Sequence, residues 1–104
     1  MSTFLFSYRT PKTYTAGSPD NVAAWTAWFQ GMGANLVDAG KPVVERRTLG
    51  NCPPETLQGG YSLVTADDID AAVELAESCP GLSDGFGVEV GELIELEAHE
   101  QNAR

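Results

Sequence analysis

The 104-residue chain is poor in the residues that bind metals and act as nucleophiles, with one histidine and two cysteines. Cys52 and Cys79 are too few for a disulfide scaffold and lack the spacing of a zinc site. The single His99 and the scattered carboxylates fit no metal-ligand spacing, and Gly59-Gly60 has no phosphate-loop context. The sequence therefore predicts no metal and no cofactor, and a reduced, cytoplasmic compartment is the default expectation.

Basic residues are scarce too, with six Lys and Arg against 15 Asp and Glu and a formal net charge of -9. The imbalance lies in residues 51–104, which carry one basic and twelve acidic side chains. Affinity for nucleic acid and for anionic lipid comes largely from Lys and Arg. We therefore expect no nucleic-acid or membrane-surface partner, and the acidity is read mainly as solubility.

Long apolar runs and a basic-then-apolar leader are missing as well, so the sequence predicts neither a membrane span nor a secretory signal. What is present suits one folded domain, because 42% of the residues are hydrophobic and 9% aromatic. We expect a single domain over residues 1–97 and a frayed tail over 98–104.

The first half of the chain predicts a strand, a helix and a second strand. Residues 3–8 alternate as a short aromatic strand. Ser18 and Pro19 are typical of a helix start, and we expect that helix to end near Val37 or Asp38, before Gly40. Its apolar stripe comprises Val22, Trp25, Phe29, Met32 and Leu36. Residues 43–49 are predicted as the second strand, followed by a loop over 50–60.

The second half predicts a strand over 61–65, a helix from about Asp67 to Cys79, and a strand over 86–90. Ile69, Ala72, Val73 and Ala76 form the apolar stripe of this helix. Residues 92–97 either extend the last strand or form a short separate one.

The resulting order, strand-helix-strand-strand-helix-strand, is the α+β ferredoxin-like βαββαβ pattern, a four-stranded antiparallel sheet with two helices on one face. Two of the predicted strands carry apolar residues on both faces, as in Phe4-Leu5-Phe6 and Val43-Val44. An uncovered apolar sheet face favours association, so we expect a symmetric homodimer with the sheets face to face.

Three stretches carry a family resemblance: WTAWFQGMGANLVDAGKPV (residues 25–43), GGYSLVTADDIDAAVELAESCP (59–80) and GVEVGEL (87–93). The most specific features are Trp28 with Asp38, Gly40 and Pro42 at this spacing. The chain resembles the YCII-related, DGPF-type family of small bacterial proteins, from the first strand to about Ile94. The resemblance implies a ferredoxin-like subunit that dimerises into an α/β barrel.

The resemblance transfers no activity. The better-known branch of the family has a His–Asp pair proposed as catalytic, with the histidine near the start of the first helix. By an approximate alignment, Ala23 and Ala24 stand at the histidine position and Cys79 near the aspartate position. The only histidine, His99, lies in the tail and is expected to be solvated.

Asp38 is the candidate catalytic residue. At the C-terminus of the first predicted helix its charge would oppose the helix dipole, so Lys41 or Arg46 would have to compensate. It is either a pocket carboxylate that acts as general base or ligand acceptor, or the acceptor of a structural bond in the AGKP turn.

Trp28, Tyr61 and Arg46 are the candidate ligand-binding residues. Trp28 lies at the edge of the helical stripe, where it could line a cleft or pack in the core. Tyr61 could reach a ligand or be an amphipathic core residue. Arg46 and Arg47 would point to opposite faces of a strand, so one could bind an anion, or both could pair with acidic residues.

The cysteines are weaker candidates. Cys79 precedes Pro80 at a helix C-terminus, which disfavours a thiolate, so buried packing is expected. Cys52 is expected in an exposed loop.

The sequence leaves three functional hypotheses open. The first is a cofactor-free enzyme acting on a small polar or anionic metabolite in a pocket between the first helix and the sheet. The second is a non-catalytic ligand-binding or regulatory interaction module, and the third a purely structural dimer. A cavity with an acid–base group within reach would favour the enzyme, and a cavity without one would favour the binding module.

Overall fold

The computed structural model describes residues 1–14 and 19–96 of the chain. Four strands, two α-helices and two short 3₁₀ helices (η1 and η2) make up this part of the molecule. Their order is β1 (Ser2–Pro11), α1 (Pro19–Met32), η1 (Gly33–Asn35), β2 (Leu36–Asp38), β3 (Thr56–Ala66), α2 (Ile69–Glu77), η2 (Pro80–Asp84) and β4 (Gly87–Leu93). None of the described helices is long and apolar enough to cross a membrane.

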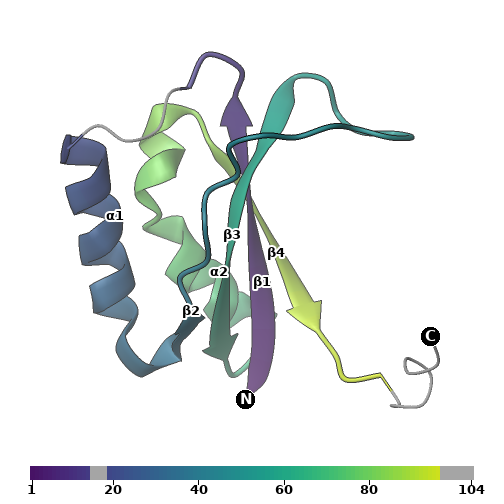
Figure 1. Cartoon of the computed structure of the whole chain (residues 1–104). Coiled ribbons are helices and arrows are strands. Elements are labelled where there is room, and N and C mark those ends of the chain that lie inside the picture. The colour runs from purple at the N-terminus through teal and green to yellow at the C-terminus, as the bar shows by residue number, and fades with distance from the viewer. Residues whose placement is uncertain (15–18, 97–104) are drawn as a thin grey trace.

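The strands form one antiparallel sheet in the order β2-β3-β1-β4. Both helices lie on the same side of this sheet (Figure 1). The ferredoxin-like α+β fold is therefore confirmed. The frayed tail predicted for residues 98–104 lies outside the described residues, and the domain boundary at residue 97 stays a prediction.

Alternation along β1 and β3 places the core between sheet and helices. Phe4, Phe6 and Tyr8 point toward the helices and are buried, and Ser62 and Val64 do the same on β3. Successive side chains of a strand point to opposite faces, so this pattern follows from the sequence. Tyr8, Thr10 and Ser62 thus bring hydroxyl groups to an otherwise apolar face.

The first helix is shorter than the sequence predicted. It ends at Met32, and Gly33 has a φ of +55°, a left-handed conformation that glycine adopts readily and that ends a helix. The chain then forms η1 and the short strand β2, whose Leu36 pairs with Val64. The prediction of a helix up to Val37 or Asp38 was wrong, because the edge of β3 offered these residues a strand partner.

The predicted strand over residues 43–49 was also wrong. Pro42, just before them, forms an isolated bridge with Gly60, and Val43 donates to the Gly59 carbonyl at 3.1 Å. None of residues 43–49 belongs to a strand in the described part of the chain, and Val44 and Leu49 are exposed. β2 already occupies the edge of β3 to which they would have paired. Residues 44–55 instead project away from the sheet on the side opposite the helices, and we call them the arm (Figure 1).

The remaining boundaries are close to prediction, with one exception. β3 begins at Thr56 within the predicted loop, where Arg9 donates from Nε and Nη2 to the side chain and carbonyl of Thr56. α2 begins after Asp68, whose carboxylate caps the helix by accepting from the backbone N–H of Ala71 at 2.8 Å. β4 extends to Leu93, so the first of the two alternatives for that segment holds in part.

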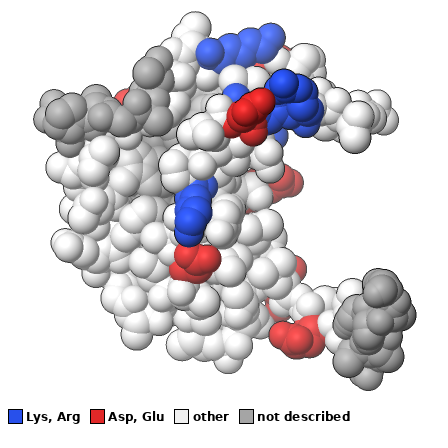
Figure 2. Space-filling view, viewed as in Figure 1, with Lys and Arg blue, Asp and Glu red and all other residues white. Residues whose placement is uncertain are grey.

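The side of the sheet away from the helices is open. Leu5 and Leu63 face each other on it, with Tyr61 farther along β3 and Leu93 on β4. In the space-filling view, basic and acidic side chains lie side by side at the arm, and acidic ones lie toward the C-terminal end, on either side of a hollow (Figure 2). The second face expected from the sequence is thus apolar only in part, because polar residues such as Ser7 and Glu89 share it and the Val43-Val44 stretch is not a strand.

Candidate functional site

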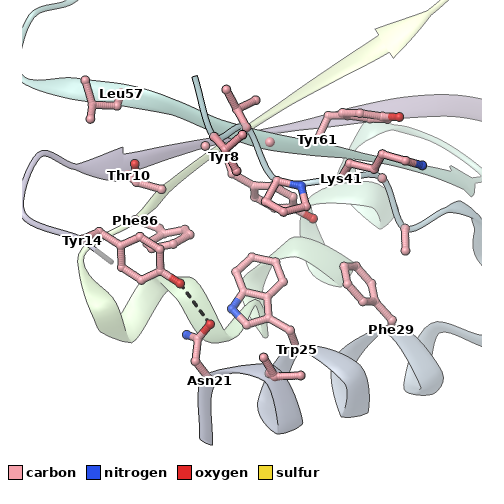
Figure 3. A pocket seen from close by; sticks show the side chains of 18 of the residues that line it. Tyr8, Thr10, Tyr14, Asn21, Trp25, Phe29, Lys41, Leu57, Tyr61 and Phe86 are labelled. Carbon is pink, nitrogen blue, oxygen red and sulfur yellow. Dashed lines mark hydrogen bonds between the residues drawn. The ribbon is translucent and has the colours of Figure 1, made fainter. Parts of the chain in front are cut away.

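A cavity of about 600 Å³ lies between α1 and the sheet. Val22, Trp25, Thr26 and Phe29 of α1 form one wall, and Tyr8 and Thr10 of β1 stand across from them (Figure 3). The other lining residues are Tyr14, Asn21, Ala39, Gly40, Lys41, Pro42, Val43, Val44, Arg46, Leu57, Gly59, Gly60, Tyr61 and Phe86. The cavity lies where the sequence predicted a pocket, between the first helix and the sheet.

Aromatic rings hold this cavity open. Trp25 meets Tyr8 edge-to-face at 5.0 Å between ring centroids and lies 5.8 Å from Phe86. Tyr14 meets Phe86 edge-to-face at 4.6 Å. Wide rings on α1 keep the helix away from the sheet, and rigid rings cannot collapse into the space that remains.

The segment from Ala39 to Val44 borders the cavity and depends on Gly40. A Cβ atom at Gly40 would lie 1.7 Å from the carbonyl oxygen of Tyr61, and the residue has a φ of +78°. Only glycine permits both the close approach and the left-handed backbone. The AGKP sequence thus brings this segment across β3.

Two hydroxyl groups and a backbone carbonyl form a hydrogen-bonded chain on the sheet side of the cavity. The Tyr8 hydroxyl donates to Ser62 Oγ at 2.8 Å, and Ser62 Oγ donates to the carbonyl oxygen of Ala39 at 2.7 Å. Burial raises the pKa of the Tyr8 hydroxyl and outweighs the hydrogen bond to Ser62, which lowers it. Tyr8 therefore keeps its proton at neutral pH.

A second polar chain closes the end near residue 14. The Tyr14 hydroxyl donates to Asn21 Oδ1 at 3.0 Å (Figure 3). Asn21 Nδ2 in turn donates to an Asp84 carboxylate oxygen at 3.3 Å. Burial and the nearby Asp84 carboxylate raise the pKa of Tyr14. These bonds join the segment after β1, α1 and η2 at one end of the cavity.

Of the predicted binding residues, Arg46 and Tyr61 line the cavity. The Nε of Arg46 donates to the Gln58 carbonyl at 3.1 Å and its Nη2 to the Val43 carbonyl at 3.0 Å. The neighbouring Arg47 is exposed and lies 3.5 Å from Glu45 in the sole ion pair found among the described residues. The two arginines thus have different partners, but they belong to the arm and not to a strand, so the alternation expected for them does not apply.

Tyr61 borders the cavity but points elsewhere. Its side chain lies beside Lys41 on the far side of β3 from Trp25, and 37% of its surface is exposed (Figure 3). Its position on the open face follows from its pairing with Ser7. A direct ligand contact for Tyr61 stays a prediction.

Asp38 and Trp28 lie outside the cavity lining. Asp38 ends β2, and its Oδ1 accepts from the backbone N–H of Gly40 at 2.8 Å, which is the turn bond considered for it. Trp28 is buried, stacks on Phe6 and donates from Nε1 to the Leu75 carbonyl at 3.1 Å. This geometry supports a structural role for each of the two residues. A catalytic role for Asp38 and a ligand contact for Trp28 stay predictions.

The cysteines lie where the sequence predicted them. Cys79 is buried, and burial raises the pKa of its thiol above the ordinary value. Cys52 is exposed, and its thiol donates weakly to the Leu49 carbonyl at 3.4 Å. Neither lines the cavity.

Sequence reasoning missed the residues that dominate the lining, above all Tyr8, Tyr14 and Phe86. A signal for Tyr8 was present: alternation places it on the same face as Phe4 and Phe6, which marks a hydroxyl turned toward the core. Tyr14 and Phe86 carried no such signal, because they lie far apart in sequence and meet only in the fold.

Fold and cavity together define a ferredoxin-like α+β protein with an aromatic pocket under its first helix. The chain is similar in structure to 5-chloro-2-hydroxyhydroquinone dehydrochlorinase from Burkholderia phenoliruptrix AC1100, solved in complex with 2,5-dihydroxybenzoquinone. The match has a TM-score of 0.66 and 20% sequence identity, and covers 91% of this chain and 96% of that chain. No family model and no curated protein matches the chain. The similarity confirms the fold, and membership of the YCII-related family stays a prediction.

Proposed function

We propose that this protein binds a small, planar aromatic anion in the cavity under α1. The observation that carries the proposal is a cavity of about 600 Å³ walled by aromatic rings with a half-buried arginine at its border. Ligand pockets commonly enclose about 300–1,000 Å³ and combine apolar walls with few polar groups.

The walls favour a flat ring as ligand. Trp25, Phe29 and Phe86 present ring faces and edges to the same space. Aromatic pairs prefer offset-stacked or edge-to-face contacts, which a planar ligand can make with several of these residues at once.

Arg46 favours a negative charge on that ligand. Its guanidinium has five N–H donors, of which two bond to backbone carbonyls, and no carboxylate within the described residues pairs with it. An anionic oxygen would compensate the charge and use the remaining donors. The structural neighbour supports this ligand class, since 2,5-dihydroxybenzoquinone is a planar ring with acidic hydroxyls.

Binding without catalysis ranks ahead of an enzyme. The lining, taken from the described part of the chain, contains no carboxylate, imidazole or thiol. Its ionisable groups are tyrosines, Lys41 and Arg46, and burial keeps Tyr8 protonated. Acid–base catalysis near neutral pH works best with a group whose pKa lies close to the ambient pH.

Ligand titration tests this function, with 4-hydroxybenzoate and 2,5-dihydroxybenzoquinone as probes and acetate as a non-aromatic anion. We expect both rings to bind and to change tryptophan fluorescence. Arg46→Gln should weaken binding by about 10-fold or more, as a charge-assisted hydrogen bond contributes ~1.5–3 kcal/mol. Arg47→Gln is the matched control and should bind like the unchanged protein. Equal losses in both variants, or binding of acetate alone, would refute the proposal.

We further propose that a second copy of the chain covers the open face of the sheet. Leu5, Leu63 and Leu93 give this face apolar surface, and the arm adds the exposed Leu49. A two-fold axis between the sheets and perpendicular to the strands would bring the arm of one copy to the C-terminal side of its partner. Such an arrangement agrees with the dimeric barrel implied by the family resemblance.

Native mass spectrometry tests the dimer. Leu63→Arg should yield monomers, because it places a charge in the middle of the contact. Leu82→Arg is the control, since Leu82 is 43% exposed and belongs to η2 on the helix side. Dimers that persist in Leu63→Arg would show that another surface associates.

A further inference from the structure

The hydrogen-bond chain from Tyr8 to Ala39 has a fixed direction. The Ala39 carbonyl oxygen can only accept, so the Ser62 hydroxyl, 2.7 Å away, must point its hydrogen at it. The Ser62 oxygen can then only accept from its other neighbour, the Tyr8 hydroxyl at 2.8 Å. The single hydrogen of Tyr8 is thereby committed to Ser62.

Tyr8 consequently offers only an acceptor to the cavity it lines. Within the described residues no N–H or O–H group other than its own is bonded to the Tyr8 oxygen. Ser62 is fully buried, so its hydrogen bonds to Tyr8 and to Ala39 are shielded from competing water. The raised pKa of Tyr8 keeps the hydroxyl neutral, which preserves this direction over the physiological range.

We propose that Tyr8 selects for a ligand hydroxyl, so that the ligand class is a hydroxylated aromatic anion. The ligand's O–H would donate to Tyr8 on the sheet side, while its anionic oxygen faces Arg46. This inference rests on the proposed function and adds to it a requirement for a hydrogen-bond donor. A site built around an unmet acceptor rejects an analogue without the donor, because the buried acceptor then stays unpaired.

Two probes isolate the donor. 4-Hydroxybenzoate and 4-methoxybenzoate share the ring and the carboxylate, but the methoxy oxygen can only accept. The unchanged protein should bind 4-hydroxybenzoate about 10-fold more tightly, because an unpaired buried acceptor costs ~1–3 kcal/mol. Isothermal titration calorimetry measures both affinities under identical conditions.

The variant Ser62→Ala distinguishes recognition of the ligand's O–H donor from rejection of the methyl group by shape. Without Ser62 the Tyr8 hydrogen is free to turn toward the cavity and bond to the methoxy oxygen. We expect the preference for 4-hydroxybenzoate to fall at least about 3-fold, as a neutral hydrogen bond contributes ~0.5–1.5 kcal/mol. Rejection of the extra methyl group by shape alone would persist in this variant.

Tyr8→Phe is the second variant and serves if Ser62→Ala does not fold. It removes the acceptor and keeps the ring that packs on Trp25, so the preference should again fall. Equal affinities for the two probes in the unchanged protein would overturn the inference and leave the proposed function standing. A preference that survives in Ser62→Ala, or in Tyr8→Phe where that variant serves, would overturn it too. If neither probe binds, the proposed function fails and this inference with it.

Discussion

The two helices cover the same sheet face in different ways. α2 approaches the strands through Ala72 and Ala76, which are buried, so little space remains beneath it. α1 faces the sheet with Trp25, Trp28 and Phe29, whose rings keep its backbone farther out. Small residues at a helix–sheet contact allow close packing, whereas large rings leave gaps that other side chains must fill. The cavity is the part of the gap under α1 that stays unfilled.

The difference also divides the two tryptophans of α1. Trp28 fills the space near α2, where its Nε1 bonds to the Leu75 carbonyl. Trp25, one turn earlier, lies over the cavity and contacts Tyr8 and Phe86. Two tryptophans on one helix thus have different roles: Trp28 packs in the core, and Trp25 lines the pocket.

The largest effect should come from truncating these tryptophans in turn. Trp28→Ala should lower the free energy of unfolding by ~3–5 kcal/mol, because it removes a buried ring and its hydrogen bond. Trp25→Ala should cost less, ~1–3 kcal/mol, since that side chain is half-buried at a cavity. Urea unfolding followed by circular dichroism measures both. Equal costs would mean that the cavity wall is packed as tightly as the core.

Enlarging an alanine under α2 should have the next largest effect. Ala72 is 0% exposed, and Ala72→Leu should destabilise the fold by ~1–3 kcal/mol through overpacking. Ala23→Leu on the exposed side of α1 is the matched control and should stay within ~0.5 kcal/mol. Thermal unfolding of the pair checks this. A tolerated leucine at Ala72 would contradict close packing of α2.

The smallest effect concerns the start of α2. Asp68→Ala removes the side chain that accepts from the Ala71 N–H and should cost ~1 kcal/mol. Asp67→Ala deletes an adjacent carboxylate outside the cap and should change stability by less than about 0.5 kcal/mol. Urea midpoints of the two variants give the comparison. A similar loss in both would assign the effect to charge and not to the cap.

Element order and inward faces could be predicted because they depend on local patterns. The alternation Phe4, Phe6 and the acid-rich start of α2 require no knowledge of distant residues, and both proved correct. The strand predicted over residues 43–49 failed, because its local pattern was adequate but another segment had taken the sheet edge. Pairing is a competition between segments, which no single window of sequence reveals.

The candidate site shows the same division. Arg46 was proposed as an anion-binding residue, and it does line the cavity, whereas Asp38 and Trp28 serve a turn and the core. The family resemblance and the residue types singled out all three residues, but they did not indicate which of the three would lie at the cavity. Tyr8 carried only the weak signal of a hydroxyl on an apolar strand face.

The sequence by itself determined the ferredoxin-like order of strands and helices and the buried face of β1. These follow from periodicity, capping and glycine placement, which act over a few residues. Only the tertiary structure decided that α1 stands off from the sheet, that Arg46 borders the resulting cavity, and that Ser62 and Ala39 fix the direction of the Tyr8 hydroxyl. Those features depend on side chains from separate strands, α1 and the segment after β2 meeting in space, where packing sets the distances.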